Sequence, residues 1–423
     1  MTYLKEFLNT IKTEPVIFVA GVSVLLLAVM GTSVRHVASS TFAILVLLSF
    51  ITVKDWRSVY ISLSSLEKLF LLSFLLYMIS GVLSYYNADD IDKYVKLFER
   101  YFRFLLVIPL YLFLIKKKMS LLKYLYTGVV VSGPFLFLIA LNHTLQYPDV
   151  PAQGNYHHII FGQLAMLNAG IMLSMLFTLE LSTKLRVLIV LSVFCGVTAA
   201  IMSQARGAWL VLPLYLMFVV YCVVKSRRIS MTTVVVSLVL LVLLSSVSPI
   251  SDVVKQRTND AISEVERFYS EDKYISSVGT RLAMWNIALD VWQQAPVLGT
   301  GPGDFDDEVM TLQAEGEYTG MEVHNSVHNI YFQALVGSGV IGLAALLFTV
   351  ILLPLFVFSR GVHIDRSAAY AGFILVLSYA VFGLTESWTL RLPAVSVYLV
   401  YLLVLVSHLY VSSAGKTESR RLS

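Results

Sequence analysis

Apolar runs long enough to cross a lipid bilayer recur along almost the whole chain. A spanning helix needs about 20 mostly apolar residues, and the run MTTVVVSLVLLVLLSSVS at 231–248 cannot be a loop. The bilayer interior holds no water to satisfy an irregular backbone, so such a run must be helical. Composition agrees, because 57% of the 423 residues are hydrophobic and 14% are charged, whereas soluble domains average about 25% charged residues. We therefore expect an all-α polytopic membrane protein, and we exclude a soluble enzyme, a disordered chain and a secreted disulfide scaffold.

These runs predict about twelve membrane-spanning helices and one large loop between the ninth and the tenth. The predicted spans are 15–33, 36–53, 66–86, 98–115, 122–142, 159–179, 185–204, 207–224, 230–249, 329–358, 367–385 and 392–412. The chain then divides into four parts: nine spans with short loops (1–249), a large loop (250–328), three further spans (329–412) and a tail (413–423).

The positions of Lys and Arg predict the orientation of the chain. Both termini and the connections on their side carry 19 of the 31 Lys and Arg residues, and the other side carries 12. Because positive residues accumulate on the cytoplasmic side of a membrane, we expect both termini in the cytoplasm and loop 250–328 outside it. The net charge of +4 is too small to indicate a nucleic acid partner.

Loop 250–328 is expected to fold in part as helices. Helical segments are predicted at 251–270 and at 280–294, where Leu282, Trp285, Leu289 and Trp292 recur at helical spacing. Such a stripe is typical of a helix that lies on the membrane surface or that caps the bundle, and both interpretations stay open. A shorter external loop, 143–158, contains His143, His157 and His158, whose roles the sequence does not reveal.

Two arginines stand out on the side that should be poor in positive charge. Arg206 lies in a short external turn, where it either extends to lipid headgroups or binds an anion at the membrane boundary. Arg281 lies near the predicted start of a helix, where the helix dipole disfavours a cation. The position is favourable if the guanidinium and the backbone N–H groups of the helix start face a phosphate together. The alternative for Arg281 is a salt bridge to Asp290 or Glu271.

His328 is the candidate general base. Asn325 or Ser326 is predicted to cap the helix that enters span 329–358, which places His328 in its first turn. The positive end of the helix dipole favours the neutral imidazole there, and a neutral imidazole can accept a proton. His324 and His328 are also spaced as zinc ligands can be, but a third ligand is not apparent in the sequence.

Acidic residues offer two further candidates. Glu386, at the end of span 367–385, either pairs with Arg391 or orients a substrate hydroxyl or a catalytic His. The Gly-Asp-Phe-Asp-Asp-Glu run at 303–308 is similar to metal-binding Asp-x-Asp motifs, although the glycines around it favour a solvated turn.

Several of these features together resemble one family. The chain combines Arg206 in a short turn, Gly-Thr-Arg-x-x-x-Trp at 279–285, Pro-x-Leu-Gly-x-Gly-x-Gly-x-Phe at 296–305 and His-Asn-x-Tyr-x-Gln at 328–333. With about twelve spans and one large external loop, this set resembles the O-antigen ligase and polymerase family of membrane glycosyltransferases.

The resemblance implies a GT-C-like enzyme of the bacterial inner membrane, with its active site at the periplasmic face. It implies an undecaprenyl-pyrophosphate-linked glycan as donor, the lipid A–core as acceptor, and no metal cofactor. Carried onto this sequence, the essential residues would be His328, Arg206 and Arg281. The remaining substrate-binding candidates are Asn329, Glu386, His324, Arg100 and Arg103.

The chemistry of the residues agrees with this assignment. Displacing a lipid pyrophosphate needs positive charge on the leaving group and a base near the attacking hydroxyl. Arg100 and Arg103 share a helix face with Lys93 and Lys96, which would suit lipid phosphate headgroups or simple solvation. The alternatives are an O-antigen polymerase, which differs in its acceptor, and a lipid or glycan transporter, which would place its ionisable residues nearer the membrane midplane.

Overall fold

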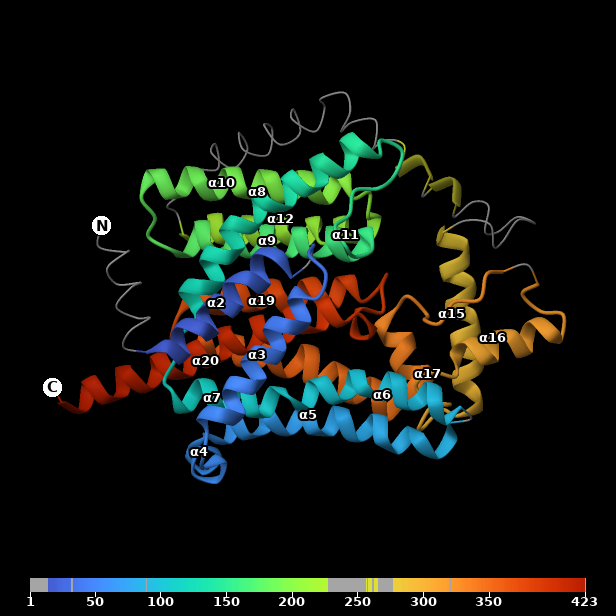
Figure 1. The fold of residues 1–423 in the computed structure, drawn as a ribbon, viewed down its shortest axis with the longest axis horizontal. Helices are drawn as coiled ribbons and strands as arrows, with labels where there is room; N and C mark the ends of the chain where they lie inside the picture. Colours follow the sequence, from blue (N-terminus) through green and yellow to red (C-terminus); the bar gives the residue numbers. More distant parts are fainter. Residues whose placement is uncertain are drawn as a thin grey trace.

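A computed structural model describes residues 14–422, except residues 32, 89, 227–255, 257, 261, 265–276 and 320. All regular structure in the described part is helical (Figure 1). The α-helices are α2 (Pro15–Met30), α3 (Val37–Thr52), α4 (Trp56–Ser62), α5 (Ser65–Leu83), α6 (Ile91–Leu105), α7 (Val107–Lys116), α8 (Leu122–Gln146), α9 (His158–Thr178), α10 (Thr183–Met202), α11 (Arg206–Trp209), α12 (Leu212–Ser226), α15 (Ser277–Gln294), α16 (Phe305–Ala314), α17 (Ile330–Leu346), α18 (Leu353–Gly361), α19 (Arg366–Phe382) and α20 (Leu392–Leu422). Shorter elements are η1 (Ser84–Asn87), the π-helical η2 (Leu347–Leu352) and η3 (Trp388–Leu390).

Seven helical stretches in the described residues are long and apolar enough to span a membrane, and the number becomes eight if the bent pair α3–α4 is one span. The seven are Ser65–Asn87, Leu122–Gln146, His158–Thr178, Thr183–Met202, Arg206–Lys225, Ile330–Gly361 and Leu392–Ala414, and each coincides with a predicted span. The class of polytopic helical membrane protein is therefore confirmed, whereas the number twelve is not.

The remaining predicted spans differ from expectation for visible reasons. α2 and α19 are apolar but shorter than a full span, and α3 and α4 meet at a bend of 100°. The predicted span 98–115 is divided at Leu106 between α6 and α7, and the part in α6 contains Arg100 and Arg103, which bond to Leu390 and Ser396. The predicted span 230–249 lies outside the described residues.

Helices α9 and α20 form the centre of the bundle. In each of them 83% of the most apolar stretch is buried, whereas the corresponding share is 33% in α10 and 28% in the α11–α12 span. α9 packs against α8, α10 and α19, and α20 packs against α3, α7 and α19. These two helices are therefore shielded by their neighbours, while α10 and α12 present apolar side chains outward, as lipid-facing helices do.

Helix α17 is broken by a kink that a loop fills. Ser338 and Gly339 have non-helical backbone angles, which free the carbonyl of Val336 and the N–H of Val340 from helical pairing. The N–H of Thr300 donates to the Val336 carbonyl at 2.9 Å, and the N–H of Val340 donates to the Pro296 carbonyl at 2.9 Å. The loop between α15 and α16 is thus bonded directly into the break, which satisfies the freed polar groups.

The predicted helix at 280–294 is confirmed as α15, but its buried face is not the predicted stripe. α15 packs on α17 and α16 through Ala283, Met284, Ile287, Ala288 and Val291, all of which are buried. Leu282, Trp285, Leu289 and Trp292 flank this face and are half-buried. The buried face thus consists of two alanines and three aliphatic or thioether side chains, and both tryptophans lie at its margin. Of the predicted helix 251–270, the described residues 256, 258–260 and 262–264 are helical.

Candidate functional site

Polar and charged side chains gather at one end of the bundle, where α9, α11 and α17 begin and α10 and α19 end. We call this the site end; it lies towards the right of Figure 1, on the side of α15 and α16. Five segments that are distant in the sequence meet there: the start of α9, the α10–α11 turn, the start of α15, residues 321–329 and the connection between α19 and α20.

His328, Glu386 and Arg391 form a chain of polar contacts at the site end. Nδ1 of His328 lies 3.2 Å from Oε2 of Glu386, and Nε of Arg391 donates to Oε1 of Glu386 at 3.1 Å. The Glu386 side chain is only 2% exposed, whereas that of His328 is 18% exposed. A buried carboxylate therefore holds one nitrogen of a partly accessible imidazole.

The carboxylate stays ionised despite its burial. Burial by itself would raise the pKa of Glu386, but the hydrogen bond from His328 and the charge of Arg391 lower that pKa to about 2. The two interpretations that the sequence left open for Glu386 are thus both realised in part, because it pairs with Arg391 and contacts the candidate base.

Asn329 is the residue that fixes the position of His328. Its side-chain oxygen accepts from the N–H groups of Tyr331 at 2.9 Å and Phe332 at 3.2 Å, so Asn329 is the N-cap of α17. The prediction of Asn325 or Ser326 as the cap, with His328 in the first turn, is therefore wrong. His328 precedes the cap and has a φ of 51°, in the left-handed region that residues other than glycine rarely adopt.

The rest of the His-Asn-x-Tyr-x-Gln motif ties the start of α17 to its surroundings. The carbonyl oxygen of the Gln333 side chain accepts from the N–H of Val327 at 3.0 Å. The hydroxyl of Ser387 accepts from the N–H of Asn329 at 3.1 Å, and the N–H of Ile330 donates to the carbonyl of Gly383 at 2.9 Å. The α19–α20 connection and the start of α17 consequently form one rigid unit.

Arg206 engages a carboxylate through both terminal nitrogens. Its Nη1 and Nη2 donate to Oε1 and Oε2 of Glu264 at 2.9 and 3.2 Å, a bidentate pair. Because Arg206 makes this pair in the described structure, extension to lipid headgroups does not account for its position. Burial would raise the pKa of Glu264, but the hydrogen bond and charge of Arg206 lower it.

Arg281 belongs to the same electrostatic environment. Burial lowers the pKa of Arg281, the charge of Glu386 raises it, and the charge of Arg206 lowers it again. Of the two predicted partners, Asp290 is exposed on α15 and Glu271 lies outside the described residues. The charges of Arg206 and Glu386 thus both act on Arg281, and Glu386 is also the residue that contacts His328.

His157 and His158 join the site end, although the sequence did not reveal their role. Their rings lie 4.4 Å apart, and Nδ1 of His158 lies 2.8 Å from the carbonyl oxygen of Ser203 in the α10–α11 turn. Burial, followed by the charge of His158, lowers the pKa of His157 to about 4, and the charges of Glu386 and His328 also act on it. The signal available in the sequence was a His pair directly before an apolar run.

His324 lies beside the candidate base. The ring centroids of His324 and His328 are 5.7 Å apart and the rings are nearly perpendicular. Burial and the charge of His328 lower the pKa of His324. Within the described residues, no three His, Cys, Asp or Glu side chains are grouped as metal ligands would be.

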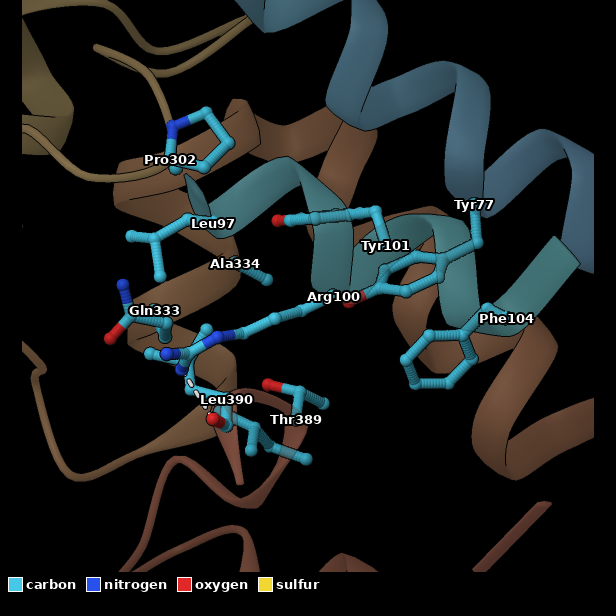
Figure 2. A pocket seen from close by; sticks show the side chains of 12 residues that line it. Tyr77, Leu97, Arg100, Tyr101, Phe104, Pro302, Gln333, Ala334, Thr389 and Leu390 are labelled. Atoms are coloured by element: carbon cyan, nitrogen blue, oxygen red, sulfur yellow. Dashed lines mark hydrogen bonds between the residues drawn. The ribbon is translucent and has the colours of Figure 1, made fainter. Parts of the chain in front are cut away.

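Arg100 and Arg103 attach α6 to the segment before and within α20. Nη1 of Arg100 donates to the carbonyl of Leu390, and Nη1 of Arg103 donates to the hydroxyl of Ser396 at 2.8 Å. A pocket beside Arg100 is lined by residues of α5, α6, α17 and η3 (Figure 2). Its lining combines the polar side chains of Gln333 and Thr389 with the rings of Tyr77 and Tyr101. These contacts give both arginines a packing role.

The acidic run at 303–308 makes ion pairs with α6. Nζ of Lys93 lies 3.2 Å from Oδ2 of Asp306 and 2.7 Å from Oδ1 of Asp307. Both carboxylates lie in the first turn of α16, where they also face the positive end of the helix dipole. In place of the predicted solvated turn, Asp306 and Asp307 attach α16 to α6.

Comparison with known proteins finds one family model and one relative. Residues 191–347, which include Arg206, Arg281 and His328, match the family model described as O-antigen ligase. A protein of Haemophilus influenzae, described as uncharacterized, is 24% identical over 342 residues, which are 78% of this chain and 83% of the relative. The chain is thus a multi-pass membrane protein that contains a segment similar to the O-antigen ligase family.

Proposed function

We propose that this protein transfers O-antigen glycan from undecaprenyl pyrophosphate to a sugar hydroxyl of lipid A–core. The observation that carries the proposal is the convergence at one end of the bundle of a carboxylate-bound His328 with two arginines, Arg206 and Arg281. An imidazole held by a carboxylate is suited to accept a proton, and two guanidinium groups are suited to a pyrophosphate. The excess of Lys and Arg on the other side supports a position of the site end at the periplasmic face of the inner membrane.

His328 acts as the general base in this proposal. When Nδ1–H donates to Glu386, the lone pair of Nε2 is left available to a substrate. The acceptor hydroxyl oxygen attacks the anomeric carbon while its proton passes to Nε2, and the bond from that carbon to the pyrophosphate oxygen breaks. Glu386 then stabilises the imidazolium that forms, as a carboxylate does in other His-based sites. In-line displacement of this kind inverts the anomeric configuration.

Arg206 and Arg281 bind the leaving group. As the bond to the sugar breaks, negative charge grows on the pyrophosphate, and positive groups held in place stabilise it without reorganising. This is the part that a metal ion performs in other transferases. With two arginines in that role, we propose a metal-independent reaction.

The test is transfer by the purified protein in a bilayer, with defined glycan-pyrophosphate-undecaprenol as donor and lipid A–core as acceptor. We expect product on lipid A–core, and loss of product in His328→Ala, Arg206→Ala and Arg281→Ala. His363→Ala, at an exposed histidine in the turn between α18 and α19, is the matched control and should retain activity. Glycan elongated on the donor lipid instead of product on lipid A–core would identify a polymerase, and full activity of His328→Ala would refute the base.

A further inference from the structure

Glu264 forms an ion pair with Arg206, one of the two arginines that the proposed function assigns to the pyrophosphate of the donor. Both terminal nitrogens of Arg206 are bonded to Glu264. The side chains are partly buried, with 22% of Arg206 and 13% of Glu264 exposed. In that setting the pair is less screened by solvent than a surface salt bridge. Glu264 therefore takes the bidentate edge between the two terminal nitrogens of Arg206, and a phosphate cannot bind that same edge at the same time.

The carboxylate also takes a backbone donor that a phosphate could use. The N–H of Val278, in the first turn of α15, donates to Oε2 of Glu264 at 2.9 Å. The charge of Arg281, on the same turn, acts on Glu264 as well. Glu264 thus accepts hydrogen bonds from both terminal nitrogens of Arg206 and from a backbone N–H at the start of a helix, and it lies in the field of a second arginine. Groups of these three kinds also bind phosphoryl oxygens.

We propose that the Glu264 carboxylate occupies the position of a donor phosphoryl group between Arg206 and the start of α15, and that the pyrophosphate displaces it on binding. This inference rests on the proposed function, since it takes Arg206 to be a pyrophosphate ligand. No bond to Glu264 is made or broken covalently. One anion replaces another on the same donors, and Glu264 returns when the lipid pyrophosphate leaves.

Competition from Glu264 affects the protein both before the donor binds and when the product leaves. Before the donor binds, Glu264 neutralises Arg206 in a partly buried place where an unpaired charge would be costly. After transfer, the product is itself a lipid pyrophosphate that two arginines would retain. Competition from Glu264 weakens the binding of the donor and of the lipid pyrophosphate product. The product is therefore released faster than it would be from arginines without this competitor.

The experiment measures binding of farnesyl pyrophosphate and of inorganic pyrophosphate to the full-length protein in detergent, by titration calorimetry. Glu264→Gln keeps the shape of the side chain but removes its charge. If the pair holds nine-tenths of unliganded molecules, removing it should tighten binding about tenfold. Glu264→Asp, which keeps the charge on a shorter side chain, should give a smaller gain of about threefold and serves if Glu264→Gln does not fold. Glu315→Gln removes one negative charge from an exposed position after α16 and should bind as the wild type does.

The outcomes separate this inference from the proposed function. Weaker or unchanged binding by Glu264→Gln, with binding lost in Arg206→Ala, means that Glu264 only positions Arg206 and overturns the inference alone. Absence of pyrophosphate binding in the wild type and in every variant overturns the proposed arginine site itself. Tighter binding by Glu264→Gln, together with stronger inhibition of transfer by added pyrophosphate, supports both.

Discussion

Nδ1 of His328 lies 3.2 Å from a carboxylate oxygen of Glu386, a residue that is 58 positions further along the chain. Two hydrogen bonds connect the same two segments: the N–H of Asn329 donates to the Ser387 hydroxyl, and the N–H of Ile330 donates to the Gly383 carbonyl. The His–Glu distance is therefore set by a rigid junction between the start of α17 and the end of α19, and does not depend on the side chains alone.

The buried Glu386 carboxylate should make stability depend on pH at the acid end. Its pKa of about 2 in the folded protein is below its ordinary value of 4.5, so its stabilisation is complete above pH 4.5 and is lost as the pH falls towards 2. Glu386→Gln should lower the melting temperature near neutral pH and flatten its decline below pH 4.5. Melting curves at several pH values check this, with exposed Glu315→Gln as the control. An unchanged acid profile would contradict the prediction.

Arg206→Lys should not be a conservative change. A lysine ammonium cannot make the bidentate contact that Arg206 makes with Glu264, nor the corresponding one with a phosphate. We expect the kcat/KM for the donor to fall about 10- to 100-fold, equivalent to about 1.4–2.7 kcal/mol. Steady-state transfer assays measure this. Arg360→Lys, at the end of α18, where the guanidinium lies over the Phe356 ring, should leave the ratio unchanged.

Gly339→Ala should destabilise the protein far more than Gly316→Ala. Gly339 has φ 62° and ψ −160°, a combination essentially confined to glycine. A Cβ there would lie 2.3 Å from backbone atoms of Val297. At Gly316, with φ 94°, a Cβ would meet nothing within 4 Å. Thermal unfolding should show a loss of at least about 3 kcal/mol for Gly339→Ala and about 1 kcal/mol for Gly316→Ala. Equal losses would mean that the loop does not hold the kink.

Transfer should continue in the presence of a chelator. Asp306 and Asp307 are paired with Lys93, so Asp306→Asn and Asp307→Asn should weaken the attachment of α16 to α6 without abolishing transfer. The check is the reconstituted assay with and without chelator, for the wild type and for both variants. Activity lost in chelator and restored by a divalent ion would instead return these carboxylates to the role of metal ligands.

The sequence predicted the spans well where an apolar run stands alone. Each of the seven full-length spans was expected within a few residues, because hydropathy and length are sufficient when lipid is the solvent. It failed at 98–115, where Arg100 and Arg103 bond to Leu390 and Ser396 from the α19–α20 connection and from α20. Such contacts are long-range, and no local pattern contains them.

The residues of the candidate site were proposed from the sequence, but the contacts that they make were not. His328, Arg206 and Arg281 stood out because charge is rare in this chain. The capping role of Asn329 was missed because Asn325 and Ser326 offered equally good local caps, and the choice depends on Ser387 and Gly383. Glu264 was missed for the same reason, since only the fold brings it to Arg206.

The kink in α17 limits which segments can be exchanged between related proteins in a chimera. Removing residues 296–300 would leave the Val336 carbonyl and the Val340 N–H without their partners inside a helix that is otherwise apolar, a cost of several kcal/mol in a nonpolar medium. The large loop is thus not a cassette that can be swapped on its own. A chimera should carry this loop and the helix through Gly342 from the same parent, or it should fail to mature.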